Sequence, residues 1–125
     1  MCPDTKVLLV YVKLELFFAA ICYYIKINPK PITAMAKKIA EQLIDTLVKS
    51  GVERIYAVTG DSLNEVNEAV RKNDQVKWIH VRHEETGAYA AAAEAQLTGR
   101  PGCCAGSSGP GHVHLINGLY DAHRS

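Results

Sequence analysis

Two adjacent carboxylates, Glu84 and Glu85, follow a short strand-like run and precede an alanine-rich segment. A carboxylate at the start of a helix lies beside unpaired backbone N–H groups and the positive end of the helix dipole, which favours its charged form. Helix capping is the simple interpretation of such a residue. Residues 87–93 are mostly glycine and alanine, so this helix can approach a neighbouring backbone or a ligand closely. We therefore select Glu84 as the candidate catalytic residue.

Glu85 is the weaker candidate, because neighbouring helical residues point about 100° apart and cannot enter one pocket equally. We expect Glu85 to face solvent or the helix dipole in the first turn. For His83, the motif H-E-x-x-H of zinc proteases fails because position 87 is Gly87. We expect His83 to be a packed or supporting imidazole. His112 and His114 are two positions apart and make a poor metal pair, so we expect no metal ligands in this chain.

The segments around Glu84 alternate between helical and strand-like patterns. Gly51 is expected to end the first helix, and Asp61 or Ser62 to cap the second. The expected order is helix 36–49, strand 54–58, helix to about 71, strand 76–81, helix 84–97, strand 103–105 and helix 111–123. Such alternation predicts parallel strands joined by crossover helices, that is, an α/β fold with a partial parallel sheet. Three strands and four helices would leave a sheet edge uncovered, so we expect the chain to be truncated.

Residues 1–34 differ from the remainder. The apolar run from Val7 to Ile25 contains Lys13 and Glu15, each of which costs about 3 kcal/mol at a bilayer centre, so a stable membrane span is not expected. Its charges also make it a poor signal peptide. We interpret 1–34 as an extension that ends in a proline-containing linker, and 35–125 as a partial domain.

Composition and charge exclude several function classes. Hydrophobic residues make up 48% and charged residues 22% of the chain, which is typical of a globular protein. The net charge of +1 gives no basic footprint, so we expect no nucleic-acid partner. No cysteine pair has C-x-x-C spacing, and the neighbours Cys103 and Cys104 should point to opposite faces of a strand. We interpret the cysteines as reduced thiols.

Three polar or glycine-rich loops follow the three expected strands. The carboxyl ends of parallel strands share one edge of a sheet, where ligands bind in α/β folds. The loop 106–111 contains neither a G-x-G-x-x-G motif nor a Walker lysine, so a nucleotide site is not indicated. It also lacks the G-x-S-x-G motif of a nucleophile elbow, because Gly109 directly follows Ser108. A purely structural turn remains an alternative for this loop.

The segments 58–64, 82–85, 105–111 and 114–119 together resemble the pyrimidine-binding domain of thiamine diphosphate enzymes. Within that superfamily they look most like the pyruvate oxidase and quinone-linked pyruvate dehydrogenase group, over residues 35–125. His114 favours this group, since many other members have asparagine there. The resemblance implies that Glu84 bonds the pyrimidine nitrogen N1′ and promotes cofactor activation by moving a proton. The cofactor-binding residues implied are Thr59, Gly60, Asp61, Glu84, Ser108, Gly109, Pro110, Gly111 and His114.

The same resemblance implies the activity of the parent enzyme. It would be a thiamine diphosphate- and FAD-dependent oxidoreductase that converts pyruvate, a 2-oxo acid, to acetate or acetyl phosphate and CO2. The main sites for Mg²⁺ and FAD would lie outside this chain, which lacks a Gly-Asp-Gly motif and would be inactive alone. The enzyme would be a cytoplasmic homo-oligomer, with peripheral association as its only membrane contact. Alternatives are an acetolactate synthase or oxo-acid decarboxylase relative, and a non-catalytic module that pairs with a full-length subunit.

Overall fold

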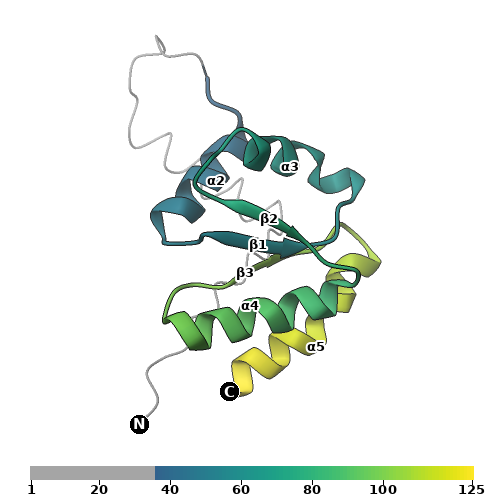
Figure 1. Ribbon diagram of the computed structural model, residues 1–125. Helices are drawn as coiled ribbons and strands as arrows, with labels where there is room; N and C mark the ends of the chain where they lie inside the picture. The colour runs from purple at the N-terminus through teal and green to yellow at the C-terminus, as the bar shows by residue number, and fades with distance from the viewer. Residues whose placement is uncertain (1–35) are drawn as a thin grey trace, which may run out of the picture.

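A three-stranded parallel sheet forms the centre of the protein. The computed structural model describes residues 36–125 (Figure 1). The expectations for residues 1–34 therefore lie outside the described part. The strands are β1 (Arg54–Ala57), β2 (Lys77–His80) and β3 (Cys103–Ala105), arranged in the order β2-β1-β3. Ile55 of β1 is in register with Trp78 of β2 and with Cys103 of β3. The predicted α/β fold with parallel strands is confirmed.

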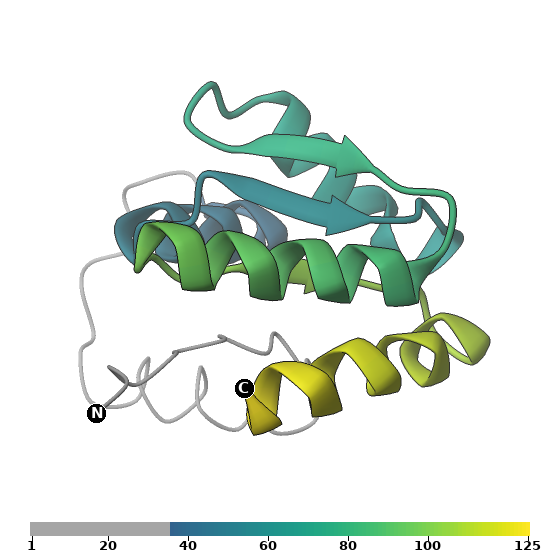
Figure 2. The ribbon, with the colours of Figure 1, turned by 60° about the horizontal axis from the view of Figure 1, so that its bottom comes forward.

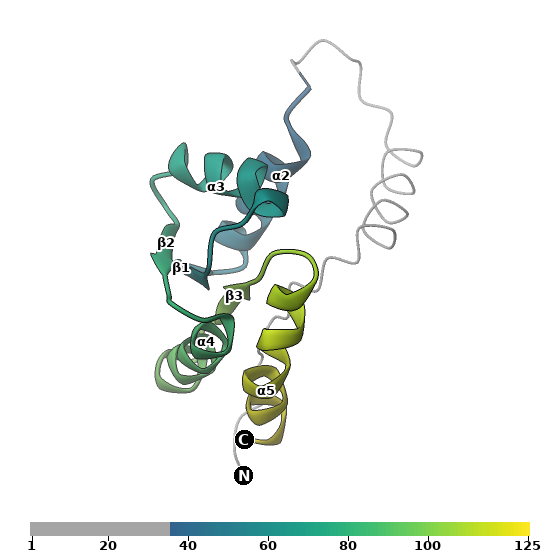
Figure 3. The same cartoon turned by 90° about the vertical axis from the view of Figure 1, so that its right-hand side faces the viewer.

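Helices cover both faces of this sheet. On one face lie α2 (Ile39–Lys49) and α3 (Asn64–Arg71), and on the other lie α4 (Glu84–Thr98) and α5 (Pro110–Arg124). Figure 2 shows α4 running along the sheet with α5 beyond it, and Figure 3 shows the sheet between the two helical layers. The helices α3 and α4 thus each return the chain to the start of the next strand, as a parallel sheet requires, and α5 follows the last strand.

The two faces of the sheet have separate hydrophobic cores. The larger core, under α2 and α3, includes Ile44, Leu47, Val52, Ile55, Ala57, Ala69, Val70, Val76 and Cys103. The smaller core, under α4 and α5, consists of Ala88, Ala91, Cys104 and Leu115, with Tyr56 and Leu119 packed against it. Cys103 and Cys104 therefore face opposite sides of β3, as strand geometry predicts.

Small residues let α4 lie close to its neighbours. A Cβ atom added at Gly87 would lie 3.1 Å from the carbonyl oxygen of Tyr56 in β1. A Cβ atom added at Gly118 of α5 would lie 2.5 Å from the Cβ atom of Ala88. The glycines and alanines of this region therefore bring β1, α4 and α5 together at distances that larger residues would prevent.

One local expectation is wrong. Neither Asp61 nor Ser62 caps a helix, because Asp61–Leu63 form a short 3-10 helix (η1) and α3 begins only at Asn64, without a side-chain cap. The Ser62 hydroxyl instead accepts a hydrogen bond from the backbone of the third loop. Elsewhere the boundaries differ from expectation by a few residues at most: α2 starts at Ile39, and Gly51, with φ of 93°, follows its C-terminal residues. Within residues 36–125, no helix is long and apolar enough to cross a membrane.

Candidate functional site

The loops after the three strands meet at one edge of the sheet. The backbone N–H of Ser108, in the third loop, donates to Ser62 Oγ, in the first, over 2.9 Å. Gly60, in the first loop, also lies against the third loop, because a Cβ atom added there would lie 2.5 Å from the Cβ atom of Ser107. Only a residue without a side chain permits this approach. The first and third loops therefore form one contiguous surface.

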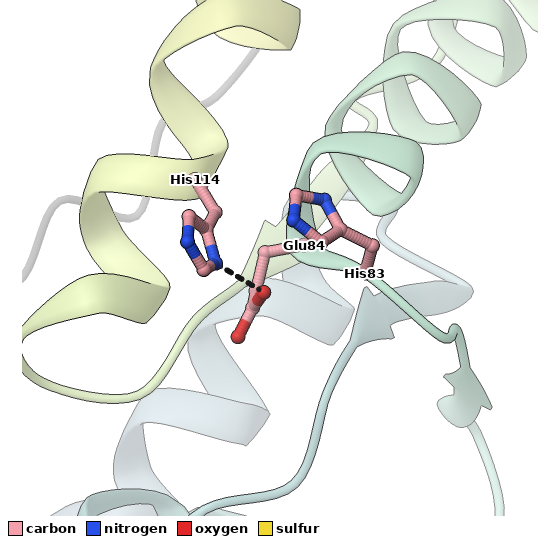
Figure 4. Close-up of side chains that lie close together, drawn as sticks. All are labelled: His83, Glu84 and His114. Carbon is pink, nitrogen blue, oxygen red and sulfur yellow. Dashed lines mark hydrogen bonds and ion pairs between the residues drawn. The ribbon is translucent and has the colours of Figure 1, made fainter.

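Glu84 lies where the second loop enters α4, beside this surface. It is the first residue of α4, and its side chain is only 12% exposed. Its Oε2 atom lies 3.0 Å from Nδ1 of His114, which projects from α5 (Figure 4). Its Oε1 atom faces Gly111, where an added Cβ atom would lie 3.1 Å away. One carboxylate oxygen is thus held by an imidazole, while the other lies against a backbone without a side chain.

The surroundings of Glu84 favour its charged form. Burial raises the pKa of the Glu84 carboxyl, but the hydrogen bond to His114, a backbone N–H bond and the nearby imidazoles of His114 and His83 all lower it. The lowering contributions dominate, so the pKa lies below its ordinary value. Glu84 is therefore a carboxylate at neutral pH and accepts hydrogen bonds.

His83 caps α4. Its backbone is extended, and its Nδ1 atom accepts a hydrogen bond from the backbone N–H of Glu85 over 3.3 Å. The simple interpretation of Glu84 as the cap is therefore wrong, since the residue before it provides the side-chain cap. An accepting Nδ1 in a neutral imidazole places the proton on Nε2. The same ring stacks on that of His114, with centroids 4.6 Å apart and planes inclined by 27°.

Glu85 has a different partner from Glu84. Its Oε1 atom accepts a hydrogen bond from Asn117 Nδ2 of α5 over 3.1 Å. Glu85 is therefore partnered by a neighbouring helix and does more than face solvent. The two adjacent carboxylates bind different residues of the same helix, His114 and Asn117.

The other residues selected from the sequence lie at varying places around Glu84. Gly109, with φ of 78°, precedes Pro110, which begins α5. Ser108 and Asp61 are exposed, and Asp61 begins η1. Thr59 instead lines a hollow of about 550 Å³ between α3 and the edge strand β2, together with Asn67 and Trp78.

Sequence reasoning missed the parts played by Ser62, Ser107 and His83. Ser62 joins the loops, and Ser107 Oγ would lie 3.2 Å from a Cβ atom at Gly111. The sequence predicts only a packed or supporting role for His83, and it does not indicate that this residue caps α4 and stacks on His114. The pair Ser107-Ser108 inside a glycine-rich loop was the one available signal, whereas the contact of His83 with α5 depends on tertiary structure.

Comparison with protein families gives a match to the N-terminal TPP binding domain of thiamine pyrophosphate enzymes over residues 37–125. This range contains the whole described fold except residue 36, and all three loops.

Individual relatives match the same part of the chain. It is similar to the putative thiamine pyrophosphate-containing protein YdaP of Bacillus subtilis, with 52% identity over 90 residues, covering 70% of this chain and 16% of the relative. Pyruvate oxidase of Lactiplantibacillus plantarum is 51% identical over 81 residues, or 64% of this chain and 13% of the relative. Chloroplastic acetolactate synthase of Arabidopsis thaliana is 36% identical over 86 residues, covering 69% of this chain and 13% of the relative. The chain thus spans less than a fifth of the length of each of these relatives.

Proposed function

Since this chain belongs to the thiamine pyrophosphate enzymes through their N-terminal TPP binding domain, we propose that Glu84 holds the pyrimidine ring of the cofactor and moves a proton at ring nitrogen N1′. The observation that carries this proposal is the Glu84 carboxylate itself. It is mostly buried at the shared edge of the sheet, its Oε2 is bonded to His114, and its Oε1 faces Gly111. A carboxylate with one oxygen held in place is suited to share a proton with a ring nitrogen.

The glycine loop beside Glu84 supports this proposal. Gly111 and Gly106 have no side chains, and a Cβ atom at Gly106 would lie 2.6 Å from the carbonyl oxygen of Gly111. The loop therefore keeps its backbone next to Oε1 of Glu84, where a ring can approach. When bound, thiamine diphosphate supplies the electron sink for decarboxylation of a 2-oxo acid.

In this proposal the residues near N1′ have separate roles. Glu84 bonds the ring nitrogen, and His114 fixes the orientation of the Glu84 carboxylate through its Nδ1 atom. The loop residues Gly60, Asp61, Ser108, Gly109 and Pro110 complete the pyrimidine side of the site, and Thr59, which lines the hollow between α3 and β2, contributes only through the first loop to which it belongs. The residues that hold the diphosphate and its Mg²⁺ belong to other parts of the enzyme, in keeping with the small share of its relatives that this chain spans.

For the reaction of the whole enzyme, we infer oxidative decarboxylation of pyruvate with FAD as the electron carrier. This inference is supported by the 51% identity to a pyruvate oxidase and by His114, the residue type that the family resemblance associates with this group. We further propose a cytoplasmic homo-oligomer, with peripheral association as its only membrane contact. The second candidate is an acetolactate synthase, supported by the 36% identity to the plant enzyme.

The role of Glu84 is tested by Glu84→Gln in the complete enzyme. Glutamine keeps the shape and can accept from His114, but it cannot exchange a proton, so turnover should fall by at least about 10²-fold. Glu85→Gln is the matched control, because it changes the adjacent carboxylate, whose partner is Asn117. Near-normal turnover of Glu84→Gln, or an equal loss in both variants, would exclude the proposed role.

The choice between the two reactions is tested by mixing the complete enzyme with pyruvate in the absence of oxygen. A pyruvate oxidase reduces its flavin, which bleaches the visible flavin absorbance. Formation of acetolactate with no bleaching would instead establish the second candidate.

A further inference from the structure

Three potential metal ligands meet at the entrance to α4. His83, Glu84 and His114 each offer one ligand atom, and these atoms all lie within 4.8 Å of one another. Figure 4 shows the two imidazoles flanking the carboxylate. His83 and Glu84 come from the second loop and α4, whereas His114 comes from α5, so spacing along the sequence could not reveal the cluster.

These three side chains favour some metal ions over others. Two imidazoles and one carboxylate are a common ligand set for Zn²⁺ and related divalent cations, whereas Mg²⁺ prefers oxygen ligands. Three protein ligands also leave a coordination position for water. The neutral imidazoles and the charged Glu84 would give the bound cation a net charge of +1, so part of its charge is offset.

Binding requires rotation of two side chains. Metal–ligand bonds of about 2.0–2.2 Å place the ligand atoms of one ion within about 3.5 Å of one another. Glu84 Oε2 and His114 Nδ1 already lie 3.0 Å apart, but the three ligand atoms spread over up to 4.8 Å, so the imidazoles have to turn to bind one ion. The side chains of His83 and His114 are 48% and 43% exposed, so both rings have room to rotate toward Glu84. The Glu84 carboxylate, 12% exposed, provides the fixed ligand.

We propose that His83, Glu84 and His114 form a binding site for a single Zn²⁺ ion, and that this ion and the cofactor's pyrimidine ring exclude one another. The exclusion rests on the proposed function, because both ligands would use the same carboxylate. Zinc binding itself does not rest on it. The site therefore couples the availability of zinc to loading of the cofactor.

Zinc binding is tested with the full chain by titration calorimetry with Zn²⁺ at pH 7.5. Cys2→Ser and Cys22→Ser are introduced throughout, so that no thiol from residues 1–35 competes for the metal. We expect saturation at one equivalent, with affinity at least about tenfold lower in both His83→Ala and His114→Ala, because even the loss of an outer partner of a metal ligand costs this much. His123→Ala, a change of an exposed histidine near the end of α5, is the matched control and should leave the affinity unchanged. Circular dichroism confirms that each variant is folded.

Absence of saturable binding would overturn the proposal, as would affinities that are insensitive to His83→Ala and His114→Ala. An equal loss in His123→Ala would also overturn it. The exclusion is tested separately in the complete enzyme, where Zn²⁺ should raise the concentration of thiamine diphosphate needed for half-maximal activity, and His83→Ala should weaken this effect. If zinc binds as expected but does not change the cofactor requirement, then the shared use of Glu84 is wrong, while the zinc site stands.

Discussion

His114 Nδ1 lies 3.0 Å from Glu84 Oε2, although the two residues are 30 positions apart in the chain. This contact joins the start of α4 to the first turns of α5. It exists because α4 and α5 pack through small residues, with Gly118 against Ala88. The position of the candidate catalytic carboxylate therefore depends on the packing of these two helices as well as on its own loop.

Replacing His114 by phenylalanine should destabilise the protein. The ring remains available to stack on His83, but the mostly buried Glu84 loses its hydrogen-bond partner. We expect the free energy of unfolding to fall by about 1–3 kcal/mol, the usual cost of leaving such a group without a partner. Urea denaturation measures this change. His123→Phe is the control, and a loss of the same size in that variant would show that the contact with Glu84 is not the cause.

Replacing Gly118 by alanine should also destabilise the protein, against the usual trend for helices. At an exposed helical position, alanine is more stabilising than glycine by about 1 kcal/mol. At Gly118 the new methyl group would lie 2.5 Å from the Cβ atom of Ala88 and about 3 Å from the α4 backbone, so we expect a loss of about 1–3 kcal/mol from overpacking.

A second substitution separates the causes of this loss. Ala88→Gly removes the closest atom, so combined with Gly118→Ala it should restore part of the packing energy, measured as a coupling in a double-mutant cycle. The restoration is partial because the backbone contacts to Tyr89 and Glu85 remain. Stabilisation by Gly118→Ala alone would mean that α4 and α5 are less closely packed than described here.

Most of the fold could be predicted from the sequence, because its elements have strong local patterns. The predicted third strand, 103–105, coincides with β3, and the helix beginning at Glu84 ends one residue later than expected. The start of α3 could not be predicted. Asp61 and Ser62 have the composition of helix caps, but Ser62 bonds Ser108, 46 positions away, and its segment forms a 3-10 turn instead. A tertiary contact there replaced a local one.

The site was predictable in part. Glu84 and the glycine loop could be selected because the carboxyl ends of parallel strands meet. The stacking of His83 on His114 could not be predicted, because the two residues are distant in the sequence and nothing near either of them indicates the other. This contact depends on how α4 and α5 pack together, which the sequence alone does not give.

The thiols of Cys103 and Cys104 should be unreactive in the folded protein. Burial is the main cause that raises their pKa values, to about 12 for Cys103 and about 11 for Cys104. Iodoacetamide reacts with the thiolate, so at pH 8 we expect alkylation at least about 100-fold slower than in denaturant. Mass spectrometry of the alkylated peptides measures both rates. Rapid labelling of either residue under native conditions would show that β3 is accessible.

These raised pKa values also predict loss of stability at alkaline pH. Because the folded state keeps both thiols protonated, their contribution is fully present below the ordinary pKa of 9 and declines as pH rises toward 11–12. Cys103→Ala should therefore reduce the slope of the free energy of unfolding against pH above 9. Lys72→Ala is the control, because Lys72 follows the last residue of α3 and is exposed. In that variant, adding Cys103→Ala should still reduce the slope.

The ion pair between Arg54 and Glu94 should stabilise the protein more than an exposed pair of the same geometry. Arg54 Nε in β1 donates to Glu94 Oε1 in α4 over 2.7 Å, and the Glu94 side chain is only 13% exposed. Arg54→Met would leave this carboxylate mostly buried without its cation, which lowers the free energy of unfolding.

Arg71→Met is the matched control, because Arg71 also donates over 2.7 Å, to Glu68, but both of those side chains are well exposed and such pairs contribute little. Urea denaturation should show the larger loss in Arg54→Met, and adding Glu94→Leu should recover part of it, since the uncompensated carboxylate is then removed. Equal losses in Arg54→Met and Arg71→Met would mean that burial of Glu94 adds nothing to the contact between the sheet and α4.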